Sequence, residues 1–167
     1  MKFRDTSPVL AHENFLWVFA GALATTVPHA SHQPVWITVF AGLLFGWAFW
    51  HWQKRTNPPS RWLLIGLVIA ICGGVLLQYR TLFGRDAGVA LLVMFSALKL
   101  LELKTRRDAV VAVTLGYFLL LTHYFDAQGI PTAIGLLVAA TLLTATLIRI
   151  HGGGLLKPLP TLRFAAV

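Results

Sequence analysis

The side chains best suited to take part in chemistry lie near the ends of long apolar runs. Lys99 and Glu102 are three residues apart, a spacing that places an ammonium and a carboxylate on one face of a helix. If the run crosses a membrane, such charges are candidates for ion transport or signalling. The simpler interpretation is a structural pair near the end of the run, where a lysine can extend its ammonium to water. We favour the structural interpretation and keep transport or signalling as the alternative.

A second set of charges follows Lys99 and Glu102 in the link to the next apolar run. Arg106, Arg107 and Asp108 lie in this link and at the start of that run. Glu102 precedes Arg106 by four residues, the helical spacing for an ion pair. We expect these side chains to form one charge cluster that fixes the depth of two helices.

Four further candidates lie at the other ends of the same two apolar runs. Arg85 and Asp86 open the first run, whereas His123 and Asp126 close the second. If the two runs form an antiparallel helix pair, these groups come together at one rim. We therefore expect a contact between Arg85 and Asp126 or between Asp86 and His123.

Metal, thiol and catalytic chemistry have weak support in this sequence. His123, Asp126 and the loop residues His29 and His32 are of metal-ligand type, but no pair has a recognised ligand spacing. Cys72 is the only cysteine and lies inside an apolar run, so the chain holds no Cys-x-x-Cys motif. Neither paired carboxylates nor a Gly-rich phosphate loop occurs. We expect no catalytic residues, no metal and no cofactor.

The composition places the chain among membrane proteins. Hydrophobic residues make up 57% of it and charged residues 12%, with a mean hydropathy of +0.72. Soluble domains carry about 25% charged residues. The net charge of +8 could suggest nucleic-acid binding, but the basic residues occur as short clusters between apolar runs. We exclude nucleic acid as a partner and expect a lipid bilayer.

The apolar runs predict an all-α, polytopic transmembrane bundle that forms a single domain. Each run approaches the roughly 30 Å thickness of the hydrocarbon core when helical. Six spans are expected, at about 8–27, 35–52, 61–79, 87–103, 108–125 and 131–150. Residues 151–167 form a basic tail that leads into the start of a further span. The Gly42–Gly46 pattern predicts close helix contact within the bundle.

The basic residues also predict the orientation of the spans. If the N-terminus is cytoplasmic, the outside loops hold only Arg80 and Arg85, while Lys99 lies within a span. This bias follows the positive-inside rule and predicts that both termini are cytoplasmic. The eleven inside residues are Lys2, Arg4, Lys54, Arg55, Arg61, Lys104, Arg106, Arg107, Arg149, Lys157 and Arg163.

Five short motifs occur in a specific order along the second half of the chain. The motifs resemble the N-terminal membrane region of TgpA-type bacterial transglutaminase-like proteins, and a weaker similarity extends over the whole chain, including Pro28-His29. They are Gly84-Arg-Asp-Ala-Gly-Val-Ala-Leu-Leu-Val93, Ala97-Leu-Lys-Leu-Leu-Glu-Leu103, Arg106-Arg-Asp108, Leu115-Gly-Tyr-Phe118 and Gln128.

The resemblance implies a role for the chain inside a longer enzyme. Proteins of that family carry several N-terminal spans, a large periplasmic transglutaminase domain with a Cys-His-Asp triad, one further span and a cytoplasmic tail. Cys72, in an apolar span, cannot serve as the nucleophile, which needs a nearby base and access to substrate. We therefore expect a non-catalytic anchor in the bacterial inner membrane, whose partners are its own periplasmic domain and other membrane proteins. The alternative is a small transporter or a module that binds a lipid or lipid-linked substrate.

Overall fold

The computed structural model describes residues 10, 12–55, 59–81, 83–126 and 129–151, and these residues form helices joined by short links. No strand occurs within these ranges, which confirms the predicted all-α class. In chain order the elements are α1 (His12–Thr26), the 3-10 helix η1 (Val27–Ser31), α2 (Val35–Lys54), α3 (Arg61–Tyr79), α4 (Arg85–Leu101), α5 (Arg106–Asp126) and α6 (Ile130–His151).

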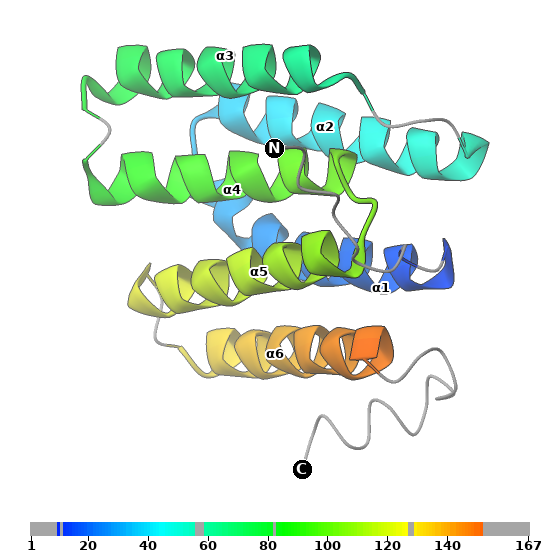
Figure 1. The fold of residues 1–167 in the computed structure, drawn as a ribbon. Helices are drawn as coiled ribbons and strands as arrows, with labels where there is room; N and C mark the ends of the chain where they lie inside the picture. Colours follow the sequence, from blue (N-terminus) through cyan, green and yellow to red (C-terminus); the bar gives the residue numbers. More distant parts are fainter. Residues whose placement is uncertain (1–9, 11, 56–58, 82, 127–128, 152–167) are drawn as a thin grey trace.

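The α-helices lie side by side, and successive helices run in opposite directions (Figure 1). Helices α3, α4, α5 and α6 follow one another across the bundle, with α2 packed on α4 and α1 packed on α5 and α6. Helix α4 contacts α1, α2, α3 and α5, whereas the main neighbour of α3 is α4. Helix α4 is therefore the centre of one half of the bundle, and α3 is peripheral.

The observed helices overlap the residue ranges predicted for the spans, and local signals explain several of the helix ends. Helix α3 matches its predicted range, and the side chain of Ser60 caps it by accepting a hydrogen bond from the Leu63 N–H at 3.4 Å. Helices α2 and α3 each end at an arginine in the left-handed region, Arg55 (φ 50°) and Arg80 (φ 56°). The predicted start of the first span and the tail after His151 lie outside the described residues.

Four helices, α2, α3, α5 and α6, have the length and apolar composition needed to cross a membrane. The described part of α1 has 15 residues and α4 has 17. At about 1.5 Å per residue, these two are shorter than the roughly 20 residues of a straight span. Within the described residues, the structure thus supports four membrane-length helices.

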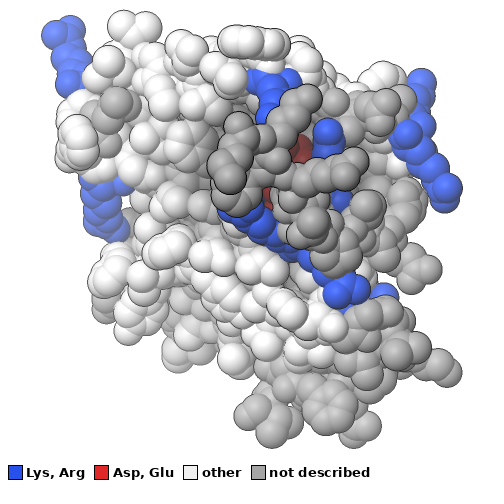
Figure 2. All heavy atoms as spheres, viewed as in Figure 1, with Lys and Arg blue, Asp and Glu red and all other residues white. Residues whose placement is uncertain are grey.

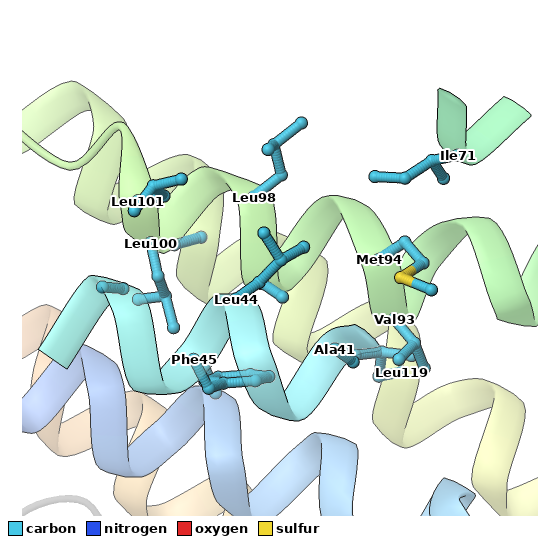
Figure 3. Close-up of a cluster of buried hydrophobic side chains, with 14 of the residues drawn as sticks. Ala41, Leu44, Phe45, Ile71, Val93, Met94, Leu98, Leu100, Leu101 and Leu119 are labelled. Atoms are coloured by element: carbon cyan, nitrogen blue, oxygen red, sulfur yellow. The ribbon is translucent and has the colours of Figure 1, made fainter. Parts of the chain in front are cut away.

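Helix α4 supplies much of the hydrophobic core. Its side chains Val93, Met94 and Leu100 are almost fully buried. Figure 3 shows the side chains of Val93, Met94, Leu98, Leu100 and Leu101 beside Ala41, Leu44 and Phe45 of α2, with Ile71 of α3 and Leu119 of α5 nearby. The hairpin that opens with α4 is therefore the element around which α2 and α3 pack.

Close helix contact depends on glycines other than the predicted pair. Gly42 and Gly46 have nothing within 4 Å of the position a Cβ would occupy, so the predicted close contact at this pattern is wrong. Leu143 of α6 instead fits between Gly21 of α1 and Gly116 of α5, where added Cβ atoms would lie 2.9 and 3.0 Å from its Cδ2. These glycines let α1, α5 and α6 approach one another.

The basic residues gather at one end of the bundle. The end of α2, the start of α3 and the α4–α5 turn share this end, which we call the basic end, and most visible Lys and Arg side chains lie toward it (right-hand side of Figures 1 and 2). The opposite end carries Arg80 and Arg85. The described residues of the basic end are Lys54, Arg55, Arg61, Lys99, Lys104, Arg106, Arg107 and Arg149.

Candidate functional site

The α4–α5 turn holds a network of charged and polar side chains centred on Asp108. The Nζ atom of Lys99 donates to Oδ1 of Asp108 at 2.6 Å and to Oε2 of Glu102 at 3.1 Å. The side chains of Lys99 and Asp108 are each 19% exposed, whereas that of Glu102 is 48% exposed. The Lys99–Asp108 pair, which is shorter and less exposed, therefore joins α4 to α5. The Lys99–Glu102 pair lies at the more exposed edge of the network.

The second carboxylate oxygen of Asp108 organises the backbone of the turn. Asp108 Oδ2 accepts hydrogen bonds from the backbone N–H of Lys104 (3.3 Å), the backbone N–H of Thr105 (3.0 Å) and the Thr105 hydroxyl (2.8 Å). In return, the N–H of Asp108 lies 3.2 Å from Thr105 Oγ1. This reciprocal arrangement is a capping box, in which residues at N-cap and N3 satisfy each other's exposed groups. It starts α5 directly after the turn.

The turn also fixes the start of the described chain. The backbone N–H of Leu10 donates to the carbonyl oxygen of Lys104 at 3.0 Å. Leu10, the residue described before α1, is therefore hydrogen-bonded to the α4–α5 turn at the basic end.

The predicted contact between Glu102 and Arg106 does not form among the described residues. Helix α4 ends at Leu101 and α5 begins at Arg106, so the two residues are not on one helix and the four-residue spacing does not apply. Arg106 is half-buried and Arg107 exposed in the first turn of α5. The structure therefore brings Lys99, Glu102 and Asp108 together and leaves the two arginines beside them.

Of the two contacts predicted for the rim residues at the opposite end, the structure describes both partners of one. Arg85 and Asp86 are exposed in the first turn of α4. Asp126 ends α5, but its side chain lies outside the described part of the chain, so the Arg85–Asp126 contact stays a prediction. Within the described ranges, no hydrogen bond or ion pair joins Asp86 to His123, and the ring of His123 lies 5.2 Å from that of His29, centroid to centroid.

His29 is a buried histidine at this opposite end. Its segment was predicted as a loop, but it forms η1, and the side chain of His29 is 1% exposed. Nδ1 lies 3.1 Å from the carbonyl oxygen of Thr25, and Nε2 lies 3.1 Å from Oγ1 of Thr122. His29 thus joins α1 and η1 to α5.

A groove of about 330 Å³ lies beside the charge network, between α3 and α5 and over α4. Its apolar lining includes Val68, Phe95 and Leu115, and its charged lining residues are Lys99 and Glu102.

The described residues give little support for metal binding or thiol chemistry. The described residues contain no group of three or more His, Cys, Asp or Glu side chains that could hold a metal ion. Cys72 is half-buried within α3. The charge network itself can hold helices together, but it presents no nucleophile beside a base.

Sequence reasoning missed two positions, Thr105 and Arg149. Thr105 and the predicted cluster residue Asp108 carry the Thr-x-x-Asp pattern of a capping box, which was a readable signal. Arg149 of α6 is 6% exposed, with its guanidinium 5.1 Å from the centroid of the Trp17 ring of α1. No comparable signal in the sequence marks the burial of Arg149.

Comparisons with known proteins show which family and which protein the chain is similar to. Residues 17–167 match the TgpA N-terminal domain family. A protein named protein-glutamine gamma-glutamyltransferase from Pseudomonas aeruginosa is 36% identical over 154 residues, which cover 90% of this chain. The chain spans only 23% of the length of that relative. No solved structure matches the chain.

Proposed function

Because the chain belongs to the TgpA N-terminal domain family, we propose that it is the non-catalytic membrane anchor of a longer transglutaminase-like protein. The observation that carries this proposal is the length of the match. Nine-tenths of the chain corresponds to less than a quarter of a protein that is named as a gamma-glutamyltransferase. The catalytic domain of the parent then lies outside this chain, and the chain itself is not an enzyme.

The proposed anchor crosses the bacterial inner membrane six times. Four helices meet the length requirement directly. Helices α1 and α4 lie in the same bundle, and each runs opposite to the helices next to it in the chain, which supports counting them as spans (Figure 1). The excess of Lys and Arg at the basic end supports a cytoplasmic location for that end and for both termini.

The α4–α5 turn gives the anchor a fixed depth in the membrane. The Lys99–Asp108 pair and the Thr105 capping box hold two antiparallel helices together at the basic end. Lys104, Arg106 and Arg107 surround this turn with charges that remain in water or at lipid headgroups. The turn therefore resists movement into the hydrocarbon core.

A domain exchange tests the anchor proposal. Residues 1–167 of the parent are replaced by an unrelated six-span domain with both ends cytoplasmic, and gamma-glutamyl transfer is measured in isolated membranes. An anchor predicts activity per inserted molecule close to that of the unmodified parent. Loss of activity in a protein that is inserted and folded would contradict it.

The groove between α3 and α5 favours a second candidate, in which the domain binds a lipid or lipid-linked substrate. The matched test is Val68→Trp, which fills the groove, against Ile69→Trp, whose side chain is 66% exposed on α3. The second candidate predicts that only Val68→Trp lowers parent activity while both variants insert normally. Equal activity of the two variants supports the anchor.

A further inference from the structure

The groove between α3 and α5 extends along α3 and α4 toward the basic end. Ile65 and Val68 line it from α3, and Leu98 and Glu102 line it from α4. Arg61, the exposed first residue of α3, precedes Ile65 by four residues and Val68 by seven, so these three side chains share one helix face. Glu102 follows Leu98 by one helical turn and is the C-cap of α4. Arg61 and Glu102 therefore lie where the groove reaches the basic end, at the start of α3 and the end of α4 (Figure 1).

The carboxylate of Glu102 is only partly engaged by the protein. The ammonium of Lys99 contacts two carboxylates and lies closer to that of Asp108. Asp108 also accepts hydrogen bonds from the backbone of the turn. Within the described ranges, Lys99 engages Glu102 through Oε2 alone, and the side chain of Glu102 is 48% exposed. A cationic group that enters this end of the groove can therefore form a charge-assisted hydrogen bond with Glu102.

Arg61 provides the opposite charge at the same end of the groove. Its side chain is exposed, and α4 is the main neighbour of its helix. A guanidinium binds a phosphate group through paired N–H donors. This end of the groove thus presents a cation on α3 and an anion on α4, which together complement a zwitterion.

The rest of the groove suits a hydrocarbon chain. Its lining beyond the charged residues is apolar and includes Phe95 and Leu115. Ile65 and Ile69 of α3 are 49% and 66% exposed, as expected for a helix that faces lipid. The groove volume of about 330 Å³ is at the lower end of the roughly 300–1,000 Å³ found for small-molecule sites, so the groove holds part of an acyl chain. A ligand that matches the whole groove carries an acyl chain, a phosphate and an ammonium.

The carboxylate of Glu102 selects among phospholipid headgroups. A primary ammonium has N–H donors for a carboxylate, whereas a quaternary ammonium has none. A glycerol headgroup carries no cation. We propose that the groove binds a phospholipid of the phosphatidylethanolamine class, with its ammonium at Glu102, its phosphate at Arg61 and one acyl chain along the apolar lining. The proposal rests on the lipid-binding candidate for this groove and on the location of the basic end at the lipid headgroups.

The test uses the full-length parent in phosphatidylcholine nanodiscs, labelled with photoactivatable phospholipids that share one diazirine-bearing acyl chain. Their headgroups are ethanolamine, choline or glycerol, and crosslinked peptides are mapped by mass spectrometry. The ethanolamine probe should label residues 64–68 and Leu115 about fivefold more than either other probe, the gain expected from one exposed charge-assisted contact. Val68→Trp fills the groove and should abolish this labelling. Ile69→Trp is the matched control and should retain it, because Ile69 is exposed and does not line the groove.

Glu102→Gln separates headgroup recognition from acyl-chain binding. The amide keeps the size of the side chain but not its charge, so labelling by the ethanolamine probe should fall to the level of the choline probe. Asp86→Asn is the matched control, since Asp86 is an exposed carboxylate at the opposite end of the bundle, and it should keep the preference. Arg61→Gln should lower labelling by every probe, because each probe carries the phosphate.

The outcomes distinguish the headgroup from the lipid site, and both from the anchor. Equal labelling of the wild-type groove by the three probes would overturn the ethanolamine proposal and leave the lipid-binding candidate standing. An unchanged preference in folded Glu102→Gln would overturn it as well. If no probe labels the groove, the lipid-binding candidate falls with the proposal, whereas the domain exchange decides the anchor separately. The comparison of probes in the wild type needs no variant, so it decides the question even if Glu102→Gln fails to fold.

Discussion

The Nζ atom of Lys99 lies closer to Asp108, at 2.6 Å, than to Glu102, at 3.1 Å, although Glu102 is the nearer residue in the sequence. The shorter contact runs from α4 to α5. A pair within one helix would only stabilise that helix, whereas this pair joins the two arms of the hairpin. The α4–α5 turn is therefore held by charge as well as by its short length.

Double-mutant cycles should separate the two partners of Lys99. We expect a coupling free energy of about 1–2 kcal/mol between Lys99 and Asp108, because both side chains are mostly buried. The coupling between Lys99 and Glu102 should be at most about 0.5 kcal/mol, since Glu102 is half-exposed. Unfolding of the Ala variants in mixed micelles measures both values. A coupling free energy larger for Lys99–Glu102 than for Lys99–Asp108 would show that the pair joining α4 to α5 contributes less to stability.

Loss of the capping box should destabilise the hairpin. Thr105→Val removes the hydroxyl that bonds to both the N–H and the carboxylate of Asp108, and we expect a cost of about 0.5–2 kcal/mol. Thr105→Ser keeps the hydroxyl and should stay near the wild type. Chemical denaturation of the two variants in the same detergent checks this order. Equal stabilities of the Ser and Val variants would mean that the cap contributes nothing.

Substitution by alanine should destabilise the protein at Gly116, which packs against Leu143, but not at Gly46, which does not. Gly116→Ala places a Cβ 3.0 Å from Cδ2 of the buried Leu143, so the folded state should lose about 1–3 kcal/mol. Gly46→Ala meets open space in α2 and should be neutral or slightly stabilising, because alanine favours helices. Thermal unfolding provides the comparison.

A second-site change tests the cause of the Gly116 effect. Leu143→Val shortens the side chain that packs against Gly116. The double variant Gly116→Ala/Leu143→Val should therefore be more stable than the sum of the two single changes predicts. If the changes in the free energy of unfolding are strictly additive, the loss of stability in Gly116→Ala does not arise from a clash with Leu143.

Helix positions could be predicted from this sequence because apolar runs and polar links alternate without overlap. Residues 61–79 were predicted as a span and form α3, with Ser60 as its cap. The pair Lys99 and Glu102 was also predicted and is present. These features depend on local spacing, which a sequence displays directly.

Features that depend on which helices become neighbours could not be predicted in the same way. The Gly42–Gly46 pattern permits close contact, yet α2 packs on α4 through Ala41, Leu44 and Phe45. The burial of His29 requires α5 to lie against η1. Nothing in the uncharged segment around Pro28 distinguishes a buried histidine from an interfacial one.

A topology map with reporter fusions tests the central claim that this chain is a six-span anchor with both ends cytoplasmic. Periplasm-active and cytoplasm-active reporters are joined in separate fusions after five positions: Arg55, Thr81, Lys104, Gly129 and Val167. The account predicts cytoplasmic signals after Arg55, Lys104 and Val167 and periplasmic signals after Thr81 and Gly129. A periplasmic signal after Val167, or the same side for Arg55 and Thr81, would contradict it.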